Sequence, residues 1–315
     1  MLSRLVAIVL GIAVAAVALP SSAQNSRSFV ASTGSDANNC QRITPCRTFA
    51  VAYSVTNAGG EIVPLDSAGY GGFTIAKSLI VTVPAGVHAA VGGTVVVNAG
   101  VNDTVVLDGL KIEPGGGDGI DIQSAMRVIV RNSRITGANT GISVSVSART
   151  EVNVADTEIF GPGQYGANLS SSVLSSPAVV TFDRVRIDGT SFGVWVADNT
   201  LFTARNCVVT GRSKDSNQNY GAILNQPTVT PNATSVVVED TLIANWYTAF
   251  GHPLNSGGNA SQLVLRNNTI RSTSNGAFGH PTYLTITSFG DNRFIDVDSY
   301  KSGFATSPSA YASEN

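Results

Sequence analysis

The sequence is poor in charge and in the side chains that most often carry chemistry. Charged residues make up 13% of its 315 residues, and there are only 3 His, 2 Trp and 3 Cys. A formal net charge of −2 gives no attraction to nucleic acid or anionic lipid, and no local basic cluster supplies one, so we expect no nucleic-acid partner. The few cysteines and histidines lack the further ligands that a zinc site needs, so we expect no metal and no cofactor.

Long apolar runs are absent except at the start. Residues 5–19 are an unbroken run of 15 apolar or Gly residues, preceded by Arg4 and followed by the small residues Ser21 and Ala23. This is the pattern of a secretory signal peptide, and the run is shorter than the roughly 20 residues that a membrane anchor needs. We expect 1–23 to be a signal peptide and the mature protein to be secreted or periplasmic, with no membrane span.

Cysteine usage fits that compartment. Cys40 and Cys46 stand close together in a polar stretch, which predicts a small-loop disulfide, with two free thiols as the alternative. Cys207 is left over inside an apolar strand pattern, which indicates a buried side chain that packs as a small hydrophobe.

What the chain has in abundance is Gly and β-branched residues arranged in a repeat. There are 32 Gly, and the composition favours an all-β chain. Two apolar residues, a polar or Gly anchor and a further apolar residue recur, for example at 128–135 and 263–270. Successive anchors are 22 to 34 residues apart: Gly109, Asn132, Asp156, Arg184, Asn206, Asp240, Asn267 and Asp291.

A second landmark follows each anchor, after 9 or 10 residues in every case but one, and introduces another short strand. The landmarks are Gly119, Gly141, Gly166, Gly193, Gly221, Ala249 and Ala277. Two short strands per repeat cannot bury an apolar face alone, but stacked coils share one core. Because the apolar period is two rather than 3.6, the repeat predicts a single-stranded right-handed parallel β-helix, the hand following from the general preference of parallel crossovers.

The anchor strands, the Asn or Asp at the turn and the Gly-Ile-x-Val strand resemble bacterial right-handed parallel β-helix repeat proteins of the pectate-lyase-like superfamily. The stretch through Cys40, Cys46, Phe49 and 59–62 is similar to a group of exported members without established activity. The resemblance covers 29–296 and implies the fold. It does not imply one function, because the superfamily contains lyases, hydrolases, isomerases, adhesins and phage tailspikes.

The expected domain plan has four parts. After the signal peptide comes an N-terminal segment, 24–60, with the disulfide and a capping helix at 44–58. The cap is needed because an open coil exposes apolar core and unpaired edges. The β-helix follows at 61–298, and 299–315 is expected to be a flexible C-terminal tail.

Most charged side chains in the coils are explained by structure. The outward residues Asp183, Arg205, Glu239 and Arg266 should form an alternating ladder, because neighbouring coils lie about 4.8 Å apart. A second outward row contains Lys111, Arg134, Glu158 and Arg186, and it is expected to alternate in charge over Arg134, Glu158 and Arg186. We therefore assign no catalytic residue.

Two motifs are weaker hints of a site. The stretch 118–121, Asp-Gly-Ile-Asp, resembles one piece of a polygalacturonase motif and one calcium-binding nonapeptide, but the partner motifs and tandem copies are missing, so a Gly-rich turn into a strand is the preferred interpretation. Ala-Phe-Gly-His-Pro occurs at 249–253 and 277–281, which should stack His252 and His280 at one corner. With no third ligand in view, their role stays open.

Aromatic residues give the sharper hypothesis. Trp195 should point outward, because Val194 and Val196 should fill the core. The second-strand residues expected to face outward are Asp121, Ser143, Asn168, Trp195, Ile223, Gly251 and Gly279. Tyr165, Phe192 and Tyr220 should occupy equivalent sites in successive coils, either as a sugar-binding surface or as a stack buried at the turn. The ligand-binding residues predicted on this basis are Trp195, Asn168, Tyr165, Phe192 and Tyr220.

Three functions remain in view at this point. The first is non-enzymatic binding of a polysaccharide or cell-envelope glycan, with the long segments 170–178, 212–219, 225–234 and 253–261 flanking the site. The second is a polysaccharide lyase or glycoside hydrolase with an atypical site. The third is a structural or adhesin-like surface protein. The oligomeric state is left open.

Overall fold

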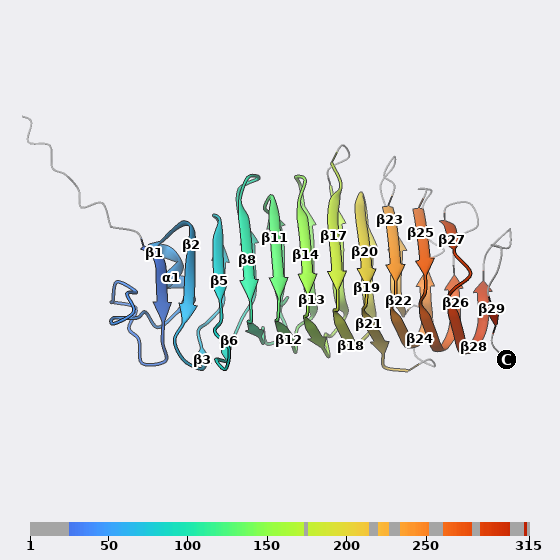
Figure 1. Ribbon diagram of the computed structural model, residues 1–315, viewed down its shortest axis with the longest axis horizontal. Coiled ribbons are helices and arrows are strands. Elements are labelled where there is room, and N and C mark those ends of the chain that lie inside the picture. Colours follow the sequence, from blue (N-terminus) through green and yellow to red (C-terminus); the bar gives the residue numbers. More distant parts are fainter. Residues whose placement is uncertain are drawn as a thin grey trace, which may run out of the picture.

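Parallel strands follow one another along the chain in regular coils (Figure 1). The computed structural model describes residues 25–172, 176–213, 220–226, 234–251, 261–278, 284–302 and 312–313. The expected signal peptide and both His252 and His280 lie outside these residues. Within them, no helix is long and apolar enough to cross a membrane.

The strands make three faces. The first face is an 11-stranded sheet of β1 (Asn25–Val30), β2 (Thr56–Pro64), β5 (Leu79–Thr82), β8 (Thr104–Asp108), β11 (Arg127–Arg131), β14 (Glu151–Ala155), β17 (Ala178–Asp183), β20 (Thr200–Arg205), β23 (Thr234–Glu239), β25 (Ser261–Arg266) and β27 (Leu284–Ser288). The second face contains β3 (Ala68–Gly69), β6 (Ala89–Val91), β9 (Lys111–Ile112), β12 (Arg134–Thr136), β15 (Glu158–Phe160), β18 (Arg186–Thr190) and β21 (Val208–Gly211).

The third face contains β4 (Phe73–Ile75), β7 (Val95–Asn98), β10 (Ile120–Ser124), β13 (Thr140–Val146), β16 (Tyr165–Ser171), β19 (Phe192–Ala197) and β22 (Gly221–Gln226). Near the C-terminal end, three longer strands run from the second face into the third: β24 (Leu242–Gly251), β26 (Thr269–Phe278) and β28 (Arg293–Ser302). The short β29 (Ala312–Ser313) pairs with the start of β28. The second and third faces are therefore continuous in one 18-stranded sheet.

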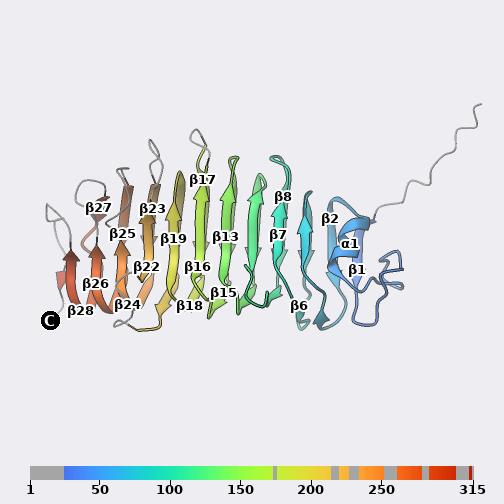
Figure 2. The same ribbon diagram turned by 180° about the vertical axis from the view of Figure 1, so that it is seen from behind.

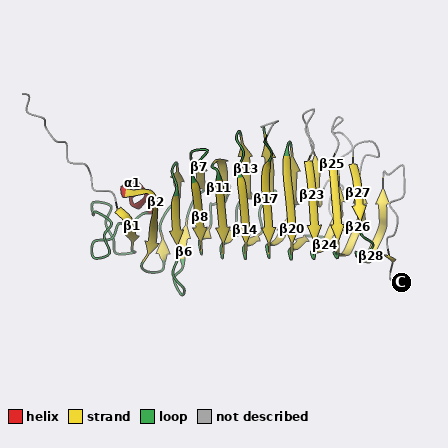
Figure 3. Cartoon of the chain, turned by 45° about the horizontal axis from the view of Figure 1, so that its top comes forward, coloured by secondary structure: helices red, strands yellow, loops and turns green. Residues whose placement is uncertain are grey.

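The coil is right-handed, as expected. First-face strands run downward on the near side of Figure 1, and third-face strands run upward in the view from behind in Figure 2, while the chain advances from β1 to β29. Figure 3 shows the strands as one row of coils with the helix at its N-terminal end.

The anchors turn the chain from the first face into the second through left-handed backbone. Gly109, Asn132, Asp156 and Asn206 have φ of 84°, 51°, 48° and 54°. Gly, Asn and Asp tolerate this region best, which explains the residue type at these anchors; Arg184, with φ of 53°, is the exception among the predicted ones. In the last coil the left-handed residue is Gly290, with φ of 79°, one position before the predicted anchor Asp291. Asp291 still precedes the buried Asn292, which accepts a hydrogen bond of 2.9 Å from the Asn268 amide, so this turn has one extra residue.

The residue after each anchor points into the core and forms an internal line. Its buried members include Ser133, Thr157, Val185, Cys207, Thr241 and Asn268. Asn268 accepts a hydrogen bond from the backbone of Thr241 at 3.0 Å and donates to the carbonyl of Val238 at 2.8 Å, which ties neighbouring coils together. Cys207 is 3% exposed, as predicted, and burial raises the pKa of its thiol to about 11.

The landmark glycines are required by close stacking at the entrance to the third face. A Cβ on Gly141 would lie 2.5 Å from the carbonyl oxygen of Gly166 and 2.5 Å from the Ile159 side chain. In the next coils, a Cβ on Gly193 would meet the carbonyl oxygen of Ala222. The landmark of that coil is thus Ala222, and the prediction of Gly221 was wrong by one residue.

The N-terminal segment joins the solenoid earlier than expected. β1 already pairs with β2 in the first face, so the coils begin well before residue 61. The helix α1 (Phe49–Val55) is shorter than the expected 44–58, because Thr48 is its N-cap and accepts a hydrogen bond from the Val51 amide at 3.3 Å. Phe49 packs against Tyr70 and Phe73, with ring centroids 5.1 and 5.2 Å apart. At the other end, β28 continues past residue 298 to Ser302.

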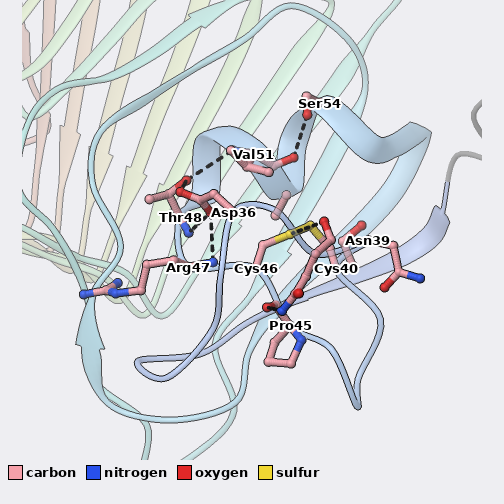
Figure 4. The surroundings of a disulfide bond; sticks show 12 residues. Asp36, Asn39, Cys40, Pro45, Cys46, Arg47, Thr48, Val51 and Ser54 are labelled. Atoms are coloured by element: carbon pink, nitrogen blue, oxygen red, sulfur yellow. Dashed lines mark hydrogen bonds between the residues drawn. A yellow bond between two sulfur atoms is a disulfide. The ribbon is translucent and has the colours of Figure 1, made fainter.

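The loop before α1 is held by a disulfide and a carboxylate (Figure 4). Cys40 and Cys46 are bonded through their sulfur atoms, with Cα atoms 4.6 Å apart. Asp36 accepts hydrogen bonds at 2.9 Å from the backbone amides of Arg47 and Thr48. These contacts fix the chain just ahead of the helix.

Candidate functional site

The third face carries a polar row that runs along the axis of the solenoid. The register pairs Asp121 with Ser143, Ser143 with Asn168 and Asn168 with Trp195. Neighbouring strands lie about 4.8 Å apart, so the row from Asp121 to Trp195 is roughly 14 Å long. Gln123 donates a hydrogen bond of 2.7 Å to the Asp121 carboxylate, which orients that group on the surface.

Trp195 closes this row and points outward. Its neighbours Val194 and Val196 are buried, while Trp195 is partly exposed. This placement agrees with the sequence prediction, and its cause is the alternation of side chains along a strand. In the following coil, the prediction of Ile223 as outward was wrong: Ile223 is 2% exposed and pairs with Val194, and Leu224 stands opposite Trp195.

Four rings meet at this end of the row. Tyr165 and Phe192 stack with centroids 5.1 Å apart at an interplanar angle of 21°. Trp195 lies edge-on to both, at 5.8 Å from Tyr165 and 5.4 Å from Phe192. Tyr220 contacts Phe192 at 5.6 Å. We name Tyr165, Phe192, Trp195 and Tyr220 the aromatic patch; each of its side chains is partly exposed.

Tyr220 does not occupy the position in the patch that the sequence predicted. Tyr165 and Phe192 are register partners, as expected, but the partner of Phe192 in the next coil is Gly221. Tyr220 therefore sits one residue before the equivalent site and reaches Phe192 from the side. A stack fully buried at the turn is also ruled out by the partial exposure of all three rings. Burial nevertheless raises the pKa of the Tyr165 hydroxyl, so it stays protonated at neutral pH.

The segments expected to border this face lie mostly outside the described residues, namely 173–175, 214–219, 227–233 and 252–260. The repeated Ala-Phe-Gly-His-Pro is out of step, because Phe250 pairs with Ala277 rather than with Phe278. Within the described part of the chain, no group of three or more His, Cys, Asp or Glu side chains could hold a metal ion. Asp118 precedes β10 in a Gly-rich turn, as the simpler interpretation had it.

The charge ladders occupy other parts of the coil. The register places Asp183, Arg205, Glu239 and Arg266 in succession, as predicted. Arg205 lies 3.9 Å from Asp183, and Arg266 lies 3.7 Å from Glu239. All these pairs are open to solvent, so each contributes little to stability.

A groove of about 610 Å³ lies where the first face turns into the second. Its charged lining residues are Lys111, Arg134, Asp156, Glu158, Arg184 and Arg186. We name it the corner groove. Arg184 binds Asp156 through two hydrogen bonds of 2.6 and 2.9 Å, which lowers the pKa of Asp156. The sequence predicted the second outward row but not the groove, because the lining combines residues of the turn with residues of the second face from several coils.

The comparisons with known proteins concern the fold. No family model matches the sequence, and no curated protein does so either. Among solved structures, a pectate lyase, Pel9A, is similar with a TM-score of 0.61 and 14% identity, over 89% of this chain and 78% of that one. A rhamnogalacturonan lyase aligns with a TM-score of 0.48 and 10% identity, over 91% and 84% of the two chains. The chain thus has a parallel β-helix fold similar to that of pectate lyase Pel9A.

Proposed function

We propose that this protein binds a glycan on its third face without transforming it, with the aromatic patch as the anchor. The observation that supports this best is the position of Trp195, which is outward, partly exposed and in contact with two further rings at the end of a polar row. Flat rings suit the C–H faces of sugars, and Ser143 and Asn168 supply hydrogen-bonding groups beside them.

The charge of this face indicates the kind of glycan. Strands β10, β13, β16 and β19 contain no Lys or Arg, and Asp121 is their single charged residue. A carboxylate on the ligand would therefore meet repulsion from Asp121 and no compensating cation. We infer that uncharged saccharides bind here in preference to polyuronates.

Export is part of this proposal. The Cys40–Cys46 disulfide is typical of proteins in oxidising compartments outside the cytosol, where envelope or extracellular glycans are also found. Periplasmic or extracellular fractions should accordingly contain the protein.

A lyase or hydrolase is the second candidate, and the corner groove is the observation in its favour, because it brings Lys and Arg together beside stacked coils. Three of its arginines, however, are engaged in ion pairs with acidic neighbours: Arg134, Arg184 and Arg186. A purely structural role predicts no saccharide binding at all.

A glycan array combined with an ultraviolet assay for unsaturated lyase products and a reducing-end assay for hydrolysis separates these functions. We expect binding to neutral glycans and no product. Trp195→Ala should abolish the binding, whereas Leu201→Ala, at a 39%-exposed site on the first face, should leave it unchanged. Release of product would favour the enzyme, and equal binding by the Trp195 variant would exclude the aromatic patch as the anchor.

A further inference from the structure

At one end of the corner groove, the positively charged side chain of Lys111 has no carboxylate partner among the described residues. Lys111 and Arg134 stand opposite each other on β9 and β12. Arg134 is paired with Glu158 at 3.4 Å, but Lys111 forms no ion pair within the described part of the chain, and its partner on the other side is Ala90. Like charges on adjacent strands, about 4.8 Å apart, repel each other and destabilise the ligand-free coil.

The rest of the groove does not remove this surplus. Four cationic side chains and two carboxylates line it, and Asp188, beside the lining, pairs with Arg186 at 2.9 Å, so the charge of Lys111 is the one left without a carboxylate among the described residues. At the far end, Arg184 and Asp156 satisfy each other.

We propose that the Lys111–Arg134 end of the corner groove binds the phosphate group of a larger molecule, a phosphate monoester. A phosphate group can supply the counter-charge that Lys111 lacks and can share Arg134 with Glu158, which lies 3.4 Å from the guanidinium. The planar guanidinium of Arg134 can donate paired hydrogen bonds to its oxygens, and Lys111 supplies a point charge.

Two further observations fit such a ligand. The Arg134 guanidinium lies 4.6 Å from the centroid of the Phe160 ring, a cation–π contact that restricts its position. A volume of about 610 Å³ exceeds what a lone phosphate fills and falls within the range of small-molecule sites. The groove and the aromatic patch are on different parts of the coil, so this site does not depend on the proposed glycan binding.

Thermal unfolding in the presence of glucose 6-phosphate, inorganic phosphate or sodium chloride at equal ionic strength tests the site. A ligand that binds only the folded state raises the unfolding midpoint in proportion to its affinity. We expect glucose 6-phosphate to raise the midpoint most, inorganic phosphate less, and chloride least. If neither phosphate compound raises the midpoint more than chloride does, the phosphate site is wrong. If glucose 6-phosphate and inorganic phosphate raise it equally, the site does not recognise the rest of a larger ligand.

Two variants that each remove one positive charge should shift the unfolding midpoint of the ligand-free protein in opposite directions. Lys111→Met should raise the midpoint of the ligand-free protein, because repulsion is removed, and should weaken glucose 6-phosphate binding by about tenfold or more. Lys111→Arg should retain binding. The matched control is Arg127→Met on the first face, where Arg127 is paired with Glu151 at 2.7 Å; it should lower the midpoint slightly and keep the phosphate shift. An unchanged phosphate shift in Lys111→Met, or a destabilised ligand-free Lys111→Met, would overturn the proposal.

Discussion

Replacing Gly141 by Ala tests directly how closely the coils stack. The added methyl group would lie 2.5 Å from the carbonyl oxygen of Gly166, a backbone atom of the next coil that is held by the third-face sheet. It would also lie 2.5 Å from the Ile159 side chain. Both neighbours would have to move, so we expect an overpacking cost of about 1–3 kcal/mol.

Two other glycines make this result specific. A Cβ on Gly92 meets nothing within 4 Å, so Gly92→Ala should change stability by about 0.5 kcal/mol or less. The three atoms nearest to a Cβ on Gly221 belong to the side chain of Leu224 and not to backbone, so Gly221→Ala should cost less than Gly141→Ala.

Urea unfolding followed by circular dichroism provides the measurement, with midpoints compared at equal slope. Solenoids can unfold in parts, so the slope must be checked before midpoints are converted into free energies. If Gly141→Ala and Gly92→Ala unfold at the same midpoint, the close approach of the coils at Gly141 is wrong.

Three more perturbations address the loop, the ladder and the carboxylates. Replacing Cys40 and Cys46 by Ser should lower stability by about 2 kcal/mol, from the entropy of a loop of this size, and a melt insensitive to reducing agent would contradict this. Arg205→Glu should cost about 1 kcal/mol or less in a denaturant titration, because its pair is exposed; a loss of several kcal/mol would mean that the ladder is not a surface feature. A hydrogen bond from Ser78 lowers the pKa of Asp103 below its usual 3.8. The ionised Asp103 therefore stabilises the fold above pH 3.8, and this contribution is lost as the pH falls through the folded-state pKa. Asp103→Asn should reduce the loss of stability at acid pH, and an unchanged acid part of the stability–pH curve would refute this assignment.

Two errors on the third face, at Tyr220 and Ile223, share one cause. The spacing from anchor to landmark is regular until the insertion at 212–219, after which Gly221 was taken as the landmark instead of Ala222. This slip of one residue led to the wrong predictions that Ile223 points outward and that Tyr220 is in register with Phe192. Side chains alternate with a period of two, so a slip of one residue reverses the face of every residue that follows in the strand.

The sequence by itself determined the repeat, the left-handed anchors, the charge ladders and the outward position of Trp195. Each depends on a local rule: residue types that tolerate positive φ, a period of two along a strand, and a fixed offset between coils. Only the tertiary structure decided that Tyr220 reaches Phe192 from outside the register, and that Lys111 and Arg134 line a groove. Both features depend on how far side chains extend from stacked coils and on the depth of the corner between two faces, which spacing along the chain does not encode.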